Sequence, residues 1–181
     1  MVEKVSLNEI IGTENEPKVL AAIAEFSCQD AEVESFLKEK AIEFDKRSKS
    51  RTYLLADGDD DEKIVIWGYY TLTLKSLKFN TGLSNSKVKK IDGFRSDVAE
   101  TESILIGQLG KDYLHREKIS GFEIIEYALD DIYAAHRIVG SRIVFLECAS
   151  NEKVIRFYRD NGFAHLQNSE DGKYLQMIRF L

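Results

Sequence analysis

The chain has 181 residues, of which 44% are hydrophobic and 31% are charged, and its formal net charge is −6. This composition predicts a folded domain with a buried core. No apolar run approaches the length of about 20 residues that spans a membrane, and the N-terminal residues do not have the pattern of a signal peptide. We therefore expect a cytoplasmic protein without membrane contact. The acidic balance argues against a protein whose main task is to hold nucleic acid, although Lys87, Lys89 and Lys90 form a local basic cluster.

Two helices are predicted in the first 50 residues, after a strand or lead-in over residues 1–13. Pro17 suits the first turn of a helix that continues through Leu20 and Ile23. Ser27, with Asp30 three residues later, predicts the start of a second helix that ends near residues 46–50. Its apolar residues recur at helical spacing: Val33, Phe36, Leu37 and Phe44.

A β-hairpin is predicted next, from strand-like runs over Thr52–Ala56 and Ile64–Leu74. The acidic residues 57–61 between them indicate a solvated turn, because the closing glutamate of a Ca²⁺ loop is missing. Residues 75–102 are polar and mixed. We expect them to form an excursion between strands, with a short helix over residues 86–91.

The later half predicts a βαβ unit with parallel strands over residues 104–148. Its helix is Gly121–Arg137, with one apolar stripe that includes Phe122 and Ile125. Ser150 or Asn151 then caps a short helix that ends at Asn161-Gly162, and residues 163–166 and 174–181 form two closing strands. Together these elements predict a mixed α/β sheet flanked by helices in one domain, residues 1–181.

The loop between the first strand and the helix of this unit is a candidate anion site. It carries Arg116 and Lys118, and Ser120 and Gly121 lie where the helix begins. A helix N-terminus presents unpaired backbone N–H groups and the positive end of its dipole, so phosphate groups bind there readily. The alternative is a strand–loop–helix turn that carries two basic residues and binds nothing.

No metal site is predicted. Cys28 and Cys148 have no metal-binding spacing and are expected to be free thiols, with Cys148 packed in the core. The three histidines are scattered along the chain, and His115, beside the loop, is assigned no role.

The second half, about residues 50–181, resembles the GNAT acyltransferases, which move acetyl from acetyl-CoA to an amine. The family loop Q/R-x-x-G-x-G/A is matched by residues 116–121, REKISG, and the family ending N…FYxxxGF by Asn151 and residues 157–163, FYRDNGF. The first half, with Phe26-Ser27-Cys28-Gln29 and the run GYYTL at residues 68–72, is similar to a subgroup that includes toxins acetylating aminoacyl-tRNA. Gln29 and Ile119 replace family glycines, and the chain is acidic where those toxins tend to be basic.

The resemblance implies the GNAT fold, with acetyl-CoA as co-substrate, and a set of site residues. The pyrophosphate is expected on backbone N–H groups of the loop, and the pantetheine arm along the end of the central strand. Asn151 and Phe157 are expected near the thiol, and Tyr158 as the general acid that returns a proton to the CoA thiolate. The expected cofactor contacts are Leu109, Gly110, Lys111, Arg116, Glu117, Lys118, Ile119, Ser120, Gly121, Asn151 and Phe157.

Simpler roles remain open for these residues. Phe157 and Tyr158 also fit core aromatics, and Asn151 a helix cap. Ile119 restricts the loop only if its position needs a positive φ. Glu147, Glu102 and Asp112 are candidates for a general base, although each fits a solvated surface acid and the amine can lose its proton to water.

Three functions are compatible with the sequence. The leading one is an N-acetyltransferase acting on a primary amine of a small molecule, peptide or protein. The first alternative is a toxin that acetylates aminoacyl-tRNA, with tRNA as partner. The second is a degenerate GNAT that binds a CoA ligand or a partner protein without turnover. A homodimer is compatible with each of them.

Overall fold

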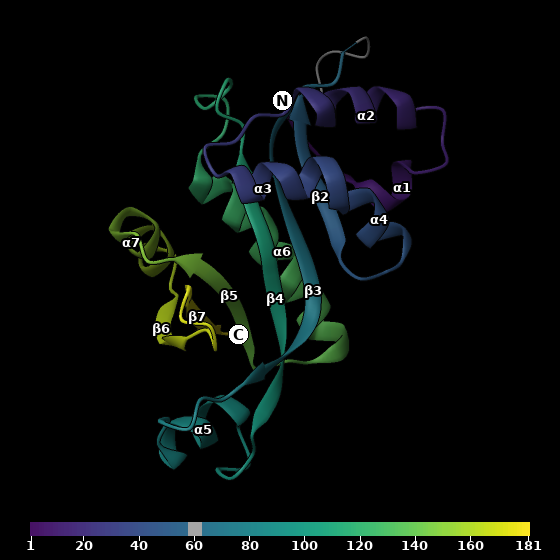
Figure 1. Cartoon of the computed structure of the whole chain (residues 1–181). Helices are drawn as coiled ribbons and strands as arrows, with labels where there is room; N and C mark the ends of the chain where they lie inside the picture. The colour runs from purple at the N-terminus through teal and green to yellow at the C-terminus, as the bar shows by residue number, and fades with distance from the viewer. Residues whose placement is uncertain (58–62) are drawn as a thin grey trace. The chain divides into compact units, whose positions relative to one another are not determined.

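The computed structural model describes residues 1–57 and 63–181, and it contains a seven-stranded mixed sheet with helices beside it (Figure 1). The strand order is β1-β2-β3-β4-β5-β7-β6. The predicted mixed α/β sheet is confirmed. The predicted acidic turn, residues 58–61, lies outside the described residues. The strands are β1 Val2–Ser6, β2 Arg51–Asp57, β3 Ile66–Lys78, β4 Glu100–Lys111, β5 Ile143–Ala149, β6 Ala164–Asn168 and β7 Tyr174–Phe180.

The helices follow the apolar periodicity closely. Pro17 stands in the first turn of α2 as predicted, and Gly140, with a φ of 76°, follows the end of α6. The helices are α1 Leu7–Ile10, α2 Glu16–Glu25, α3 Ala31–Ser35, α4 Ala41–Lys46, α5 Asn85–Asp92, α6 Gly121–Val139 and α7 Glu152–Asp160, with a π-helical stretch, η1, at Phe36–Lys40. No helix in the described part of the chain is long and apolar enough to cross a membrane.

The chain divides into two compact units, and β3, β4 and α6 each contribute to both. The first unit is Met1–Thr73 with Gly107–Leu129, and the second is Leu74–Ile106 with Asp130–Leu181. The single domain expected from the sequence stays a prediction.

The first unit is built on antiparallel pairing of β1 with β2 and of β2 with β3. Apolar side chains from α2, η1, β2 and β3 form its core, including Ile23, Leu37, Leu54 and Tyr69. Alternation along a strand places Leu54 on the face that these helices cover.

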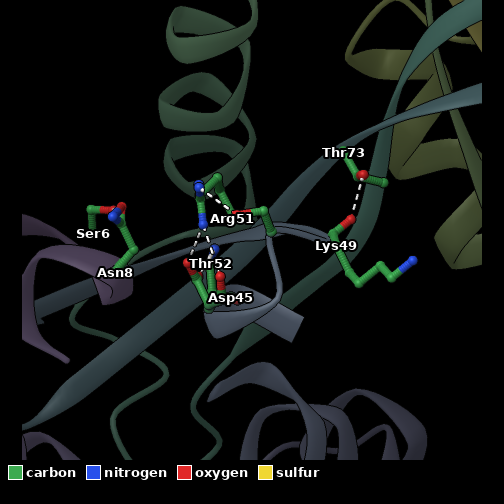
Figure 2. Close-up of polar contacts among 8 residues, drawn as sticks. Ser6, Asn8, Asp45, Lys49, Arg51, Thr52 and Thr73 are labelled. Carbon is green, nitrogen blue, oxygen red and sulfur yellow. Dashed lines mark hydrogen bonds and ion pairs between the residues drawn. The ribbon is translucent and has the colours of Figure 1, made fainter. Parts of the chain in front are cut away.

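An ion pair between Arg51 and the buried carboxylate of Asp45 fixes the connection from α4 to β2 (Figure 2). Asp45 is 2% exposed, and Arg51 Nη1 lies 2.9 Å from its Oδ1. The Thr52 N–H donates to the other carboxylate oxygen, and Thr73 Oγ1 on β3 donates to the Lys49 carbonyl. Because a buried carboxylate must be paired, these contacts determine where β2 starts.

The predicted start of the second helix was wrong. The N-cap is Asp30, whose side chain accepts from the N–H groups of Glu32 and Val33, and the helix continues through η1 into α4. Ser27 lies before it, and its N–H donates to Asp112 instead. Nothing near Ser27 in the sequence indicates a partner 85 positions away.

The second unit carries the parallel pair of the predicted βαβ unit. Ile104 of β4 pairs with Val144 of β5, and β5 pairs in antiparallel register with β7, from Ile143 opposite Phe180 to Ala149 opposite Tyr174. Its core includes Leu77, Ile91, Phe145 and Ile178. The parallel direction of the two strands in the predicted βαβ unit is therefore confirmed.

Two further predictions need correction. The excursion between strands is shorter than residues 75–102, because β3 continues to Lys78 and β4 starts at Glu100. Its helix, α5, was predicted correctly and is capped by Ser84. Phe122 does not belong to the buried stripe of α6, since it is 53% exposed, whereas Ile125 is fully buried.

Candidate functional site

The end of β4 is closely packed in the first unit. A Cβ added to Gly110 would lie 2.6 Å from a ring carbon of Tyr69 and 2.7 Å from a methyl of Val33. The Tyr69 hydroxyl donates to the Val33 carbonyl, so α3 and β3 meet over this glycine. Gly110 therefore allows the backbone of Leu109–Lys111 to lie directly against these side chains.

Asp112 holds the start of the loop that follows β4. Its carboxyl is 2% exposed and accepts from the N–H of Ser27 at 2.8 Å and of His115 at 2.9 Å, and His115 Nδ1 lies 2.8 Å away. The Tyr113 N–H donates to the Ser27 carbonyl, so two hydrogen bonds join the start of this loop to the segment before α3. The expectation of a solvated Asp112 was wrong. A carboxylate with these partners is a structural anchor rather than a free base.

Ile119 is the second anchor of the loop. Its side chain is 2% exposed. Among the described non-glycine residues, only Ser48 and Ser141 have a positive φ, so the Ile119 backbone is outside the left-handed region. The isoleucine therefore causes no strain at the position where the family has glycine, and it secures the loop by burial.

The helix after the loop begins with a capping box. Ser120 Oγ accepts from the Glu123 N–H at 3.1 Å, and Glu123 Oε2 accepts from both the N–H and the hydroxyl of Ser120, at 2.8 and 2.7 Å. These bonds hold the pKa of the Glu123 carboxyl below its usual value. The N–H groups of Gly121 and Phe122 belong to the first turn, which an α-helix leaves without an intrahelical partner.

Two cationic residues, Arg116 and Lys118, precede this helix start in the loop. The Arg116 guanidinium carbon lies 5.3 Å from the centroid of the Tyr113 ring, and Lys118 Nζ lies 5.9 Å from that of Trp67. Lys111 Nζ donates to the Arg116 carbonyl at 3.2 Å. Positive side chains and first-turn N–H groups thus lie on one short segment, which favours binding of an anion.

In the second unit, α7 carries the three other candidates. Asn151 Oδ1 accepts from the Lys153 N–H at 2.9 Å and so caps α7, as predicted. The rings of Phe157 and Tyr158 are 5.0 Å apart, and Tyr158 also meets Phe163 edge to face at 5.9 Å. Both Phe157 and Tyr158 are half-buried, so neither is a fully buried core aromatic.

The remaining candidate acids have hydrogen-bond partners, and the two thiols are free. Glu102 accepts from the Ser76 hydroxyl at 2.8 Å, and Glu147 from Gln176 Nε2 at 2.7 Å. Neither cysteine is in a disulfide, and burial raises the pKa of the thiols of Cys28 and Cys148. Outside the undescribed residues 58–62, no cluster of three or more His, Cys, Asp or Glu side chains could hold a metal ion.

The basic cluster of α5 is engaged with its own unit. Lys87 Nζ donates to the Leu166 carbonyl, and Lys90 Nζ lies 5.3 Å from the centroid of the Phe180 ring. These two lysines therefore hold α5 against β6 and β7.

The candidate residues divide between the units. Leu109–Lys111 and Arg116–Gly121 belong to the first, whereas Asn151, Phe157 and Tyr158 belong to the second. Sequence reasoning missed Asp112 as an anchor and Glu123 as a cap. The spacing S-x-x-E at residues 120–123 was the available signal for Glu123.

No protein-family model matches the chain, and no curated relative matches it. Solved structures do match. AtaT complexed with acetyl-methionyl-tRNA is 23% identical, over 100% of this chain and 94% of that chain, with a TM-score of 0.71. KacT with one tyrosine changed to phenylalanine is 24% identical, over 97% and 93%, with a TM-score of 0.72. AtaTR bound with AcCoA is 22% identical, over 97% and 92%, with a TM-score of 0.71.

This chain has the GNAT fold. The match confirms the fold predicted from the loop at residues 116–121 and the FYRDNGF ending, and it extends over the first half as well. The candidate residues lie in two places in this fold: at the end of β4 with the loop after it, and on α7.

Proposed function

We propose that this protein is an N-acetyltransferase that moves acetyl from acetyl-CoA to a primary amine. The observation that carries the proposal is the anchored loop at Asp112–Ser120, which leads a GNAT-fold strand into a helix start with first-turn N–H groups and two adjacent cations. A solved structure of similar fold, AtaTR, is bound with AcCoA.

The residues of the first unit fit a pyrophosphate group. Ile119 leaves the backbone unstrained, and Gly121 and Phe122 begin a helix of 19 residues whose dipole favours negative charge. Arg116 and Lys118 would add charge to that site. The backbone of Leu109, Gly110 and Lys111 would pair with the pantetheine arm, which demands little of their side chains.

The residues of the second unit fit the chemical step. Acetyl-CoA supplies the acetyl group, whose carbon forms a bond to the acceptor nitrogen while its C–S bond breaks. The nitrogen loses a proton and the sulfur gains one. Tyr158 is our candidate donor of that proton, because it is a half-buried phenol held edge to face against Phe157 and Phe163. Asn151 and Phe157 are our candidates for contacts near the thiol.

Aminoacyl-tRNA is a second candidate acceptor, beside an amine of a small molecule, peptide or protein. Its support is that AtaT, of similar fold, is complexed with acetyl-methionyl-tRNA. A degenerate GNAT that binds a CoA ligand or a partner without turnover has less support. That hypothesis came from Ile119 in place of a loop glycine, and Ile119 is buried with an unstrained backbone.

Acetyl transfer tests the proposal directly. The protein is incubated with acetyl-CoA and either methionyl-tRNA or a lysine-containing peptide, and thiol release and the acetylated product are both measured. We expect turnover with one acceptor and its loss in Tyr158→Phe. Expression in a bacterium then separates the acceptors, since a protein acting on aminoacyl-tRNA should arrest growth and Tyr158→Phe should relieve the arrest. Thiol release at background with every amine would overturn the proposal.

A further inference from the structure

A second-unit cavity of about 410 Å³ has no part in the proposed chemistry so far. It lies among the end of β3, the strand β5 and the β6–β7 hairpin. Most of its lining residues are polar or charged and two are aromatic. They include Lys75, Phe145, Glu147, Gln167, Tyr174 and Gln176.

The carboxylate of Glu147 is held in a fixed position on one wall. Glu147 lies two residues after Phe145, so both side chains stand on the same face of β5. Gln176 pairs with Glu147 in the β5–β7 register, and its Nε2 donates to Glu147 Oε1 at 2.7 Å. One carboxylate oxygen is thereby positioned, and the other, Oε2, faces Lys75.

Hydrogen bonds of the Gln167 side-chain amide join the three segments around the cavity. Gln167 Nε2 donates to Gln176 Oε1 and to the Lys78 carbonyl, both at 2.7 Å. Gln167 Oε1 accepts from the Asn80 N–H at 3.0 Å. Because Gln167 is 8% exposed, these bonds are shielded from water, and they preorganise the cavity.

The ammonium group of Lys75 lies beside the Glu147 carboxylate and the Phe145 ring. Lys75 Nζ lies 3.9 Å from Glu147 Oε2 and 5.7 Å from the centroid of the Phe145 ring. A carboxylate beside an aromatic face is an arrangement that recognises alkylammonium ions. The Lys75 side chain is 50% exposed and its ion pair is long, so a competing cation can displace it at little cost.

We propose that this cavity binds an ammonium group of the acetyl acceptor, with Glu147 as its specificity-determining residue and Lys75 as an internal occupant that the acceptor displaces. The proposal rests on the proposed acetyltransferase function. Glu147 precedes Asn151 by four residues, so β5 leads from this cavity to the helix that carries Tyr158. The site selects acceptors with a cationic amine and disfavours neutral or anionic ones. Where the bound ammonium is the reacting group, it first loses one proton to water, and the neutral amine then attacks the acetyl carbon.

Steady-state kinetics test the proposal with whichever acceptor, methionyl-tRNA or the lysine peptide, is turned over. In Glu147→Gln the amide oxygen still accepts from Gln176, so the fold is kept while the charge is lost. We expect the acceptor KM to rise about tenfold or more with little change in kcat or in the acetyl-CoA KM. Lys75→Met should lower the acceptor KM about two- to fivefold, as loss of a weak competing ion pair implies. Glu100→Gln, which removes the same charge from the exposed start of β4, is the control and should change neither constant.

A binding measurement separates this inference from the proposed function. The ¹⁵N-labelled protein is titrated with n-butylammonium chloride, and with n-butanol as the neutral control, while the side-chain amide signals of Gln167 and Gln176 are followed by NMR. We expect the ammonium alone to shift them, and not in Glu147→Gln. Shifts without any acetyl transfer would overturn the proposed function and leave an ammonium site. Acetyl transfer with an unchanged acceptor KM in Glu147→Gln would overturn this inference alone.

Discussion

The two units hold different kinds of candidate residues. In the first unit the candidate groups are backbone N–H groups of a loop, positioned by buried side chains such as Asp112 and Ile119. In the second unit they are side chains that are themselves accessible, Tyr158 and Glu147. Changes in the first unit should therefore alter folding and acetyl-CoA affinity together. Changes in the second should alter kcat, for Tyr158, or the acceptor KM, for Glu147, and leave stability intact.

The largest effect is expected from Tyr158→Phe. Loss of the phenol should lower kcat by about 100-fold or more, because general acid catalysis contributes 10²–10⁴-fold. The ring keeps its contacts with Phe157 and Phe163, so the melting temperature and the acetyl-CoA Kd should not change. Tyr127→Phe, which removes the hydroxyl of a half-buried tyrosine on α6, is the matched control and should leave kcat unchanged. An unchanged kcat in Tyr158→Phe would remove this residue from the chemistry.

Ile119→Ala should lower the free energy of unfolding by about 2–4 kcal/mol, as expected for truncating a buried isoleucine. The acetyl-CoA affinity should fall with it, because the loop loses its apolar anchor. Ile138→Ala is the matched control, since Ile138 is 83% exposed and its truncation should cost less than about 0.5 kcal/mol. Urea unfolding and isothermal titration measure both quantities. Equal stability of the two variants would contradict the anchoring role.

Asp112→Asn should lower the free energy of unfolding by about 2–3 kcal/mol, because hydrogen bonds to a charged group are lost and the new amide cannot accept from Ser27, His115 N and His115 Nδ1 together. Glu117→Gln, an exposed change in the same loop, is the control. If both variants unfold at the same urea concentration, Asp112 does not clamp the loop.

Glu123→Gln should bind acetyl-CoA more tightly than the wild type, by about three- to tenfold. The Glu123 carboxylate now holds the Ser120 N–H at the helix start, where we place the pyrophosphate, and a negative charge there opposes a bound anion. Glu126→Gln, one turn further along α6, is the control and should have a smaller effect. Weaker binding in Glu123→Gln would place the phosphates elsewhere.

The same cap gives the smallest effect, a pH dependence of stability. The folded-state pKa of Glu123 is lowered by its bonds to Ser120, so its contribution is fully present above the ordinary carboxyl pKa and is lost as pH falls through the lowered value. The free energy of unfolding of the wild type should exceed that of Glu123→Gln by about 0.3–0.5 kcal/mol at neutral pH, because solvent screens the exposed carboxylate. The difference should fade below about pH 4. Melting curves from pH 3 to 7 measure it. A difference in stability that does not change with pH would show that the Glu123 charge does not contribute to it.

What the sequence predicted well was governed by local patterns. Apolar periodicity located α6 and β5, and the parallel direction of β4 and β5 followed from their order with an intervening helix. Asn151 could be assigned as a cap because cap residues act on the next few N–H groups.

The parts that were missed depend on contacts between distant residues. Ser27 bonds to Asp112 rather than capping a helix, and Gly110 is required by Tyr69 and Val33, which are far from it in sequence. The ammonium-binding arrangement of Lys75, Phe145 and Glu147 likewise arises only from strand pairing. No local pattern signals such contacts.

The most direct test of the central claim is thermal unfolding with acetyl-CoA, CoA or ATP at a hundredfold excess over the acetyl-CoA Kd. A ligand that binds only the folded state then adds about 2.7 kcal/mol, which for a chain of this size raises the melting temperature by about 5–10 °C. We predict that rise with acetyl-CoA and CoA, in the wild type and in Tyr158→Phe alike, and none with ATP. No rise with acetyl-CoA would contradict the cofactor site and, with it, the proposed acetyltransferase.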